Sequence, residues 1–259
     1  MPGAGAYPGT WVVDLDGVVW LAEQPIAGSA EGVAALRDAG RRVLFATNNA
    51  SPTIAQLRAR LEAAGIAAGP DDLVTSAQAA ASMLVPGARA MVCADEGVVE
   101  ALAARGVVVV EDGPVDAVVV GWTRRFDFDL LATTVTAVRR GARLIGTNED
   151  PTHPTPERLL PGSGALLAAV ATAAQTTPEV AGKPHDPLVA LLRARAPDAA
   201  VVVGDRPSTD GVLARRLGVP FALVRTGVTA DGHEPMVVDP DEEAPDLRSL
   251  VRRHLGEGG

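Results

Sequence analysis

The chain has 259 residues, 47% hydrophobic and 21% charged, a balance typical of a globular protein with one large or two modest domains. Its net charge of −9 argues against a nucleic-acid partner, because phosphate backbones need a basic face. No apolar run reaches the roughly 20 residues of a membrane span, and the first ten residues lack a secretory-signal pattern. With a single cysteine, Cys93, an intramolecular disulfide is excluded. We therefore expect a cytoplasmic protein with no membrane partner.

Short β-branched runs alternate with alanine- and leucine-rich helical stretches from the first strand onward, which is typical of a parallel sheet covered by helices. The first series comprises a strand at 11–14, a helix at 29–39, a strand at 42–46, a helix at 52–64, a strand at 73–75 and a helix from 76.

A second series follows, with strands at 88–93, 107–110, 117–121 and 143–146 and helices at 96–105, 128–140 and 164–174. The pattern of the first series then resumes, with strands at 179–181, 200–204 and 221–224 and helices at 187–195, 209–217 and 246–255. The acidic stretch 239–245 is interpreted as a solvated loop. The order predicts an α/β protein: a Rossmann-like, doubly wound parallel sheet at 1–85 and 179–259, and an inserted α/β domain at 86–178.

Two carboxylates, Asp14 and Asp16, end the first strand, and Gly17 permits a sharp exit from it. Because side chains alternate along a strand, residues two apart point the same way. Acids at the end of an apolar strand are costly to desolvate unless they have a function. One could attack an electrophile while the other transfers a proton, although an ordinary Asp-Gly turn would also account for this segment.

Two further segments could bind an anion. Thr47 and Asn48 follow the second strand with a hydroxyl, an amide and the start of a helix, although plain helix capping would explain them too. Lys183 is the one lysine beside 22 arginines, which favours a need for a compact ammonium rather than a planar guanidinium, although chance or a solvated lysine would also account for it.

A fourth segment places Asp205 at the end of a hydrophobic strand, with Asp210 five residues later. Carboxylate oxygens suit Mg²⁺, although turn and cap roles would explain each acid singly. Ligands of open parallel sheets bind at the carboxyl ends of the strands, so we expect all four segments to meet in one crevice.

Taken together, DLDGVVW, ATNNAS, AGKP and GDRPSTD resemble the motifs of the haloacid dehalogenase superfamily of phosphatases, in the same order. The similarity is closest to subfamily IIA, the p-nitrophenylphosphatase and phosphoglycolate phosphatase-like group with a class II cap, and it covers nearly the whole chain. Two departures are small: Gly211 stands where an aliphatic residue is usual, and Val18 where threonine is commonest.

The resemblance implies an enzyme that hydrolyses a small phosphomonoester through an aspartyl phosphate. Asp14 would be the nucleophile, and Asp16 would protonate the leaving group and then activate water. Thr47 and the Asn48 region would hold the phosphoryl oxygens, while Lys183 would offset their charge.

The resemblance also implies Mg²⁺ as the cofactor. Its ligands would be Asp14, the main-chain carbonyl of Asp16 and Asp205, and Asp210 would orient a metal-bound water or Lys183.

The cap carries GTNEDPTHP and PGSGALLAAV, which look like the substrate-facing loops of the subfamily. The candidate specificity residues are Asn148, Asp150, His153 and Gly162, although a surface role explains His153 equally well. Trp20 is interpreted as packing a flap beside the site, and Trp122 as cap core or interface. Caps of this type often carry dimer contacts, so a homodimer stays open.

Three alternatives stay open at this point. A receiver-like phospho-acceptor domain also uses strand-end acids, a threonine and a lysine, but it is about half this length and lacks the insertion. A dinucleotide-binding oxidoreductase is disfavoured because the Gly162-Ser163-Gly164 cluster follows a loop and lacks the third glycine. Within the superfamily, a phosphotransferase or mutase is the remaining alternative.

Overall fold

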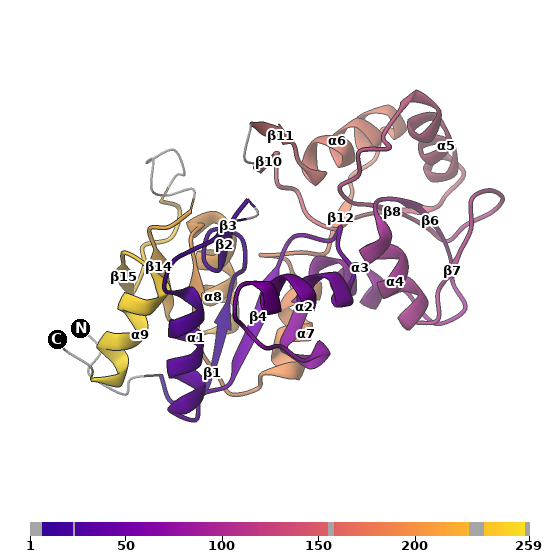
Figure 1. The fold of residues 1–259 in the computed structure, drawn as a ribbon. Helices are drawn as coiled ribbons and strands as arrows, with labels where there is room; N and C mark the ends of the chain where they lie inside the picture. Colours follow the sequence, from indigo (N-terminus) through magenta and orange to yellow (C-terminus); the bar gives the residue numbers. More distant parts are fainter. Residues whose placement is uncertain (1–6, 23, 155–157, 228–235, 257–259) are drawn as a thin grey trace. The chain divides into compact units, whose positions relative to one another are not determined.

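The computed structural model describes residues 7–22, 24–154, 158–227 and 236–256 (Figure 1). The chain forms two compact units. Unit 1 contains residues 1–47, 58–74 and 189–259, and unit 2 contains residues 48–57 and 75–188. Each unit is built around its own sheet, so each is described by itself.

A six-stranded sheet forms the centre of unit 1. Its strand order is β15-β14-β13-β1-β4-β5, and β1 pairs in parallel with both β13 and β4. The strands are β1 (Thr10–Val13), β4 (Val43–Thr47), β5 (Leu73–Thr75), β13 (Ala199–Gly204), β14 (Phe221–Val224) and β15 (Glu242–Ala244). Every residue of β1, β4 and β14 is buried, as expected for strands that are covered on both faces.

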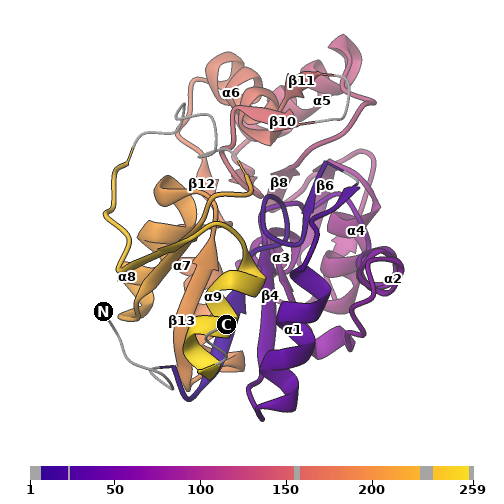
Figure 2. The ribbon, with the colours of Figure 1, turned by 60° about the vertical axis from the view of Figure 1, so that its left-hand side comes forward.

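Helices and short turns connect these strands. They are α1 (Ser29–Asp38), α2 (Ile54–Ala63), η1 (Pro70–Asp72), α7 (Asp186–Arg195), the π-helical turn η2 (Pro207–Gly211), α8 (Val212–Leu217) and α9 (Leu247–Leu255). Helices α1 and α9 lie side by side (Figure 2). A small antiparallel hairpin, β2 (Trp20–Leu21) with β3 (Gln24–Pro25), follows β1.

Unit 2 contains a second, five-stranded sheet with the order β12-β9-β8-β6-β7, in which all the neighbouring strands are parallel. Its strands are β6 (Arg89–Cys93), β7 (Val108–Val109), β8 (Ala117–Val120), β9 (Arg143–Gly146) and β12 (Glu179–Val180). Its helices are α3 (Ser76–Ser82), α4 (Glu96–Ala104), α5 (Phe128–Arg139) and α6 (Ser163–Ala174), and β10 (Thr152–Pro154) pairs with β11 (Leu159–Pro161) in a hairpin.

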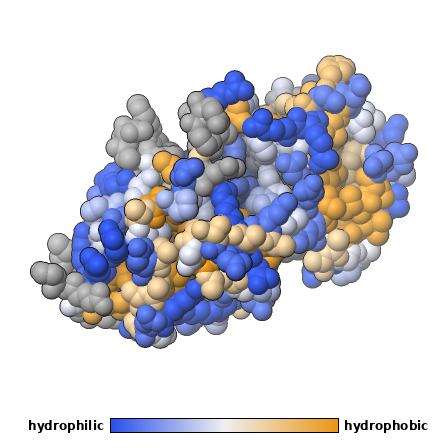
Figure 3. All heavy atoms as spheres, viewed as in Figure 1, coloured by the Kyte–Doolittle hydropathy of each residue, from blue (hydrophilic) through white to orange (hydrophobic). Residues whose placement is uncertain are grey.

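Cys93 lies in the hydrophobic core of unit 2, together with residues of α5 and α6. Burial raises the pKa of its thiol to about 12, so it stays a protonated, unreactive side chain at neutral pH. On the surface of the same unit, apolar side chains gather over α4 and β7, where Val85, Val99 and Val108 are exposed (Figure 3).

The predicted α/β class is confirmed, and the predicted helices and strands follow one another as expected, with element ends shifted by up to three residues. The strands of the hairpins β2–β3 and β10–β11 were not predicted. In the described part of the chain, no helix is long and apolar enough to cross a membrane.

Two expectations for short segments were wrong. The strand at 179–181 was assigned to the main sheet, but β12 pairs with β9 in unit 2, so residues 179–180 lie with the inserted part rather than with 179–259. The acidic stretch 239–245 was interpreted as a loop, but it contains β15, which pairs in parallel with β14. Neither edge strand is long enough to carry a periodic signal, and backbone pairing decides the structure of both.

Candidate active site

Three of the four predicted segments leave the carboxyl ends of neighbouring strands in unit 1. Asp14 follows β1, Thr47 ends β4 and Asp205 follows β13. The register aligns these ends, since Val13 pairs with both Val203 and Phe45. The fourth segment, which we expected at the same edge, follows β12 of the other sheet.

Asp14, Asp205 and Asp210 form a carboxylate cluster in unit 1. One oxygen from each lies within 4.8 Å of the others, and all three residues are buried, with exposed fractions of 8%, 4% and 0%. Burying like charges together costs several kcal/mol per ion unless a cation compensates them. An all-oxygen set of this kind fits a hard divalent cation. The donor set therefore fits the metal that the sequence predicts.

Glycines make the space that the carboxylate of Asp205 occupies. A Cβ atom on Gly17 would lie 2.4 Å from Asp205 Oδ2, and one on Gly227 would lie 1.9 Å from it. Similarly, a Cβ on Gly204 would lie 2.2 Å from the carboxyl carbon of Asp210. The main chain thus approaches the cluster more closely than any residue with a side chain would allow.

The carboxylate of Asp16 does not belong to this cluster. It is half-buried, its Oδ1 accepts a hydrogen bond of 3.0 Å from Trp20 Nε1, and its Oδ2 lies 3.4 Å from Thr47 Oγ1. The two acids therefore have different surroundings although they are two residues apart. Any metal contact of Asp16 is left to its main-chain carbonyl, as the resemblance implies.

Sequence reasoning missed two contributors to this region. Trp20 was assigned only a packing role, whereas its indole donates to Asp16, and the guanidinium of Arg60 lies over its ring at 4.2 Å. The spacing of four residues between Asp16 and Trp20 is the signal that could have suggested this contact. Thr226 Oγ1 donates to the carbonyl oxygen of Gly17 at 2.6 Å, and no sequence pattern points to it.

A polar cluster in unit 2 joins Asn48, Lys183, Asn148 and Asp150. Lys183 N–H donates to Asn48 Oδ1 at 2.7 Å, while Asn48 Nδ2 donates to the carbonyl of Lys183 at 3.1 Å and to Asp150 Oδ2 at 3.2 Å. Asn148 Nδ2 donates to the carbonyl of Asn48 at 2.7 Å. Lys183 and Asn148 are buried, with 3% and 4% exposed. Four candidate residues are thus brought together, and both Asn48 and Asn148 use their amides within the protein.

The other two candidate cap residues lie on the β10–β11 hairpin and beside it. His153 stacks against Trp122 with ring centroids 4.7 Å apart, and Trp122 Nε1 donates to the carbonyl of Pro161 at 2.9 Å. Trp122 therefore contacts both strands of this hairpin. Gly162 lies against the main chain of Asp150, where a Cβ would come within 2.2 Å of the carbonyl oxygen.

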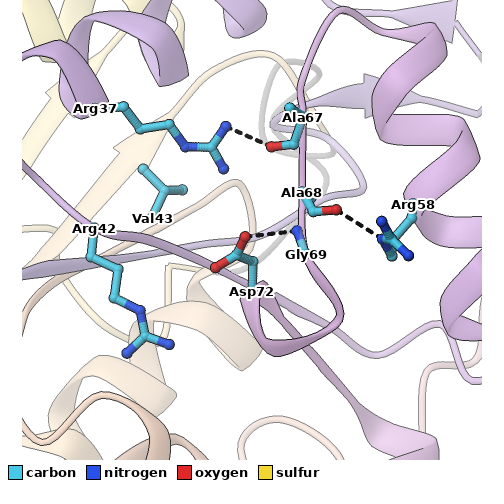
Figure 4. Close-up of a pocket in the computed structure, with 8 residues that line it drawn as sticks. All are labelled: Arg37, Arg42, Val43, Arg58, Ala67, Ala68, Gly69 and Asp72. Carbon is cyan, nitrogen blue, oxygen red and sulfur yellow. Dashed lines mark hydrogen bonds between the residues drawn. The ribbon is translucent and has the colours of Figure 1, made fainter.

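A surface pocket of about 450 Å³ in unit 1 lies apart from the carboxylate cluster, at the amino end of β4 (Figure 4). Arg37 donates to the carbonyl of Ala67 at 2.6 Å and Arg58 to that of Ala68 at 2.8 Å. These guanidinium groups hold the loop after α2 in place. Both guanidinium groups are engaged with the main chain, so we assign no catalytic role to the pocket.

Comparison with protein families agrees with the motifs. A model of the haloacid dehalogenase-like hydrolases matches residues 11–108, and a second model, of HAD-hydrolase-like proteins, matches residues 180–250.

Two curated proteins cover almost all of the chain. The D-glycerol 3-phosphate phosphatase of Mycobacterium tuberculosis is 41% identical over 251 residues, which are 92% of this chain and 70% of that protein. The acid sugar phosphatase of Staphylococcus saprophyticus is 32% identical over 251 residues, or 93% of this chain and 96% of that protein.

Solved structures give the same picture. The glycerol phosphate phosphatase of Mycobacterium tuberculosis, in complex with magnesium, superposes with a TM-score of 0.84 at 40% identity, covering 93% of this chain and 75% of that one. The p-nitrophenyl phosphatase from Archaeoglobus fulgidus gives a TM-score of 0.87 at 27% identity, covering 97% and 99%.

Proposed function

The chain belongs to the haloacid dehalogenase-like hydrolases, among the phosphatases of subfamily IIA, and from that premise we propose that it hydrolyses a small phosphomonoester through an aspartyl-phosphate intermediate. The observation that carries the proposal is the buried cluster of Asp14, Asp205 and Asp210, with Asp16 beside it but outside it. Asp14 is then available as the nucleophile and Asp16 as the proton carrier.

In the first step, a carboxylate oxygen of Asp14 forms a bond to phosphorus while the bond between phosphorus and the ester oxygen breaks. Asp16 gives its proton to the departing alkoxide. In the second step, Asp16 takes a proton from water as that water attacks the aspartyl phosphate, which releases inorganic phosphate and restores Asp14. The hydrogen bond from Trp20 holds the Asp16 carboxylate in a fixed orientation for both transfers.

Asp14 and Asp205, with the main-chain carbonyl of Asp16, would hold Mg²⁺, and Asp210 would orient this set. The fit rests on the oxygen donors and on their burial. When bound, the ion would neutralise charge on the phosphoryl oxygens and on the cluster. The magnesium complex of the Mycobacterium tuberculosis relative supports this choice of metal.

Thr47 and the main-chain N–H groups that follow β4 are proposed to bind the phosphoryl oxygens, and Lys183 is proposed to offset their charge. These roles come from the match of ATNNAS and AGKP to the family motifs. Lys183 is buried, and this supports its proposed role, because a lysine without a function would be expected to lie in solvent.

For the substrate, we propose a phosphorylated small polyol or sugar. Two relatives, named D-glycerol 3-phosphate phosphatase and acid sugar phosphatase, support this class. Asp150 and His153 are the proposed specificity residues of the cap. A screen that ranks glycerol phosphates and sugar phosphates against phosphoglycolate, nucleoside monophosphates and pyridoxal phosphate by kcat/KM tests the choice.

The first prediction concerns the metal and the nucleophile. Phosphate release should stop in chelator and return with added Mg²⁺. Asp14→Asn should reduce turnover to background while the circular dichroism spectrum stays that of the wild type. Unchanged turnover in chelator, or an active Asp14→Asn variant, would refute the mechanism. Repeated turnover also separates an enzyme from a phospho-acceptor domain, which retains its phosphate.

Lys183→Arg should lose most of the activity although the charge is kept, because a guanidinium is wider than an ammonium.

Homodimer formation is part of the same proposal, and it rests on the resemblance to subfamily IIA alone. Light scattering coupled to size exclusion measures the mass directly.

A further inference from the structure

The side chain of Asn48 binds both main-chain groups of Lys183. Its Oδ1 accepts the N–H of Lys183 at 2.7 Å, and its Nδ2 donates to the carbonyl oxygen of the same residue at 3.1 Å. These two bonds also fix which end of the amide is oxygen and which is nitrogen, because a main-chain N–H needs an acceptor and a carbonyl needs a donor. An amide bound in this way restricts the backbone rotation of the lysine that it holds.

The amide of Asn48 has no hydrogen left for a phosphate. An asparagine amide has two N–H groups, and here one goes to the carbonyl of Lys183 and the other to Asp150 Oδ2 at 3.2 Å. The side chain was expected to help hold phosphoryl oxygens, which requires a donor. Its donors are instead committed within the protein, and only its main-chain N–H is left to that role.

Asn48 is itself held from two sides. Its carbonyl oxygen accepts from Asn148 Nδ2 at 2.7 Å and from Ser76 Oγ at 2.6 Å. Neither Asn148 nor Ser76 is exposed by more than 4%. These two bonds fix the main chain of Asn48, from which its side chain projects toward Lys183.

Gly182, which precedes Lys183, allows the main chain to come close to Asn48. Gly182 N–H donates to the carbonyl of Thr147 at 2.8 Å. A Cβ atom on Gly182 would lie 2.5 Å from Asn48 Oδ1 and 2.5 Å from the carbonyl oxygen of Thr147, so only glycine allows the approach. The main chain at 182–183 is therefore fixed by Thr147 on one side and by Asn48 on the other.

We propose that Asn48 is a positioning residue that acts through Lys183, rather than a phosphate ligand. The side chain of lysine is a point charge on a flexible stem, so the place of its ammonium depends on how firmly its main chain is held. The inference rests on the proposed function in one respect, which is that the ammonium of Lys183 offsets phosphoryl charge. The clamp itself is a geometric statement about residues 48 and 183.

Activity tests the inference through a double-mutant cycle with p-nitrophenyl phosphate and Mg²⁺. Asn48→Ala should lower kcat about 10²-fold, the size of effect that a misplaced catalytic group produces. In a Lys183→Ala background the same substitution should cost less than about twofold, because the group through which Asn48 acts is gone. A full additional loss in that background would show that Asn48 contacts the substrate directly, and would overturn the inference.

Ser76→Ala is the matched control. It removes one of the two hydrogen bonds to the carbonyl of Asn48, but the bond from Asn148 and both bonds of the clamp remain, so its kcat should stay within about twofold of the wild type. Asn48→Asp serves if Asn48→Ala fails to fold. It keeps the size of the side chain but turns an oxygen toward the carbonyl of Lys183 and toward Asp150, so it should be as impaired as the alanine variant.

A second measurement does not depend on turnover. Lys183 is the one lysine of the chain, so modification by trinitrobenzenesulfonate, located by peptide mass spectrometry, reports on a single ε-amino group. In the wild type and in Ser76→Ala the buried lysine should react slowly, and in Asn48→Ala or Asn48→Asp at least tenfold faster. Equal rates in all four folded proteins would overturn the clamp. If the wild type released no phosphate, the proposed function would fail, while the labelling rates would still decide the role of Asn48.

Discussion

Gly17, in the turn that follows β1, has a φ of +85°, in the left-handed region, and packs against the carboxylate of Asp205. Two separate constraints, the backbone conformation and the close contact, therefore favour glycine at this position. The backbone conformation favours glycine by about 1 kcal/mol, and the close approach excludes any Cβ.

Gly17→Ala is predicted to weaken magnesium activation. The new methyl group would displace the Asp205 carboxylate, so the Mg²⁺ concentration for half-maximal activity should rise about tenfold or more, as for other changes that disturb the support of a ligand. A titration of phosphate release against Mg²⁺ measures it.

Gly40→Ala is the control for that experiment. Gly40 also has a positive φ, of +73°, but a Cβ there would meet nothing within 4 Å. Gly40→Ala should lower the melting temperature by as much as the backbone strain of Gly17→Ala does, but it should leave the Mg²⁺ titration unchanged. If the two variants behaved alike, backbone strain rather than the Asp205 contact would explain both.

At the scale of the elements, helix ends follow the rules of local capping. α5 begins after Asp127, whose side chain accepts the N–H of Leu130 at 2.8 Å, and α9 begins after Asp246, which accepts the N–H of Ser249 at 2.7 Å. Both bonds satisfy donors that have no partner inside the helix.

Asp127→Ala is predicted to destabilise unit 2 by about 1 kcal/mol, the usual cost of losing such a cap. Asp112→Ala, at an exposed position between β7 and β8, should change stability by less than about 0.5 kcal/mol. Urea unfolding of both variants measures the difference. A cost of Asp127→Ala no larger than that of the control would mean that the hydrogen bond contributes nothing net.

Across the whole molecule, the two ends of the described chain pack together in unit 1. His254 in α9 lies with its ring centroid 4.5 Å from that of Tyr7 and 5.7 Å from that of Trp11, and its Nε2 lies 2.6 Å from Glu242 Oε2. Burial, assisted by the nearby acids Glu242 and Asp241, raises the pKa of Tyr7 to about 12.

His254→Ala is predicted to destabilise the protein by about 3 kcal/mol, because it opens a cavity among the rings and removes a partner of the buried carboxylate of Glu242. His185 offers the matched comparison. It also pairs with a glutamate, Glu149, at 2.9 Å, but its side chain is 29% exposed and that of Glu149 59%. His185→Ala should therefore cost less than about 1 kcal/mol in chemical unfolding. Similar losses in the two variants would contradict the role given to burial.

The sequence by itself determined the α/β class, the order of the helices and of the longer strands, and the short motifs that carry Asp14, Asp16, Lys183 and Asp205. These features are local: apolar periodicity sets an element, and a polar group at a strand end marks an edge of a sheet. The roles of those residues stay predictions, which the experiments above test.

Only the tertiary structure decided which sheet β12 joins, which three carboxylates share a cluster, and that the amide of Asn48 is bound to Lys183, 135 residues away along the chain. Pairing between distant segments depends on loop closure and on backbone hydrogen bonds, which leave no repeating pattern in the residues involved. A motif can therefore indicate that a residue is functional, while the fold determines which residues its side chain contacts.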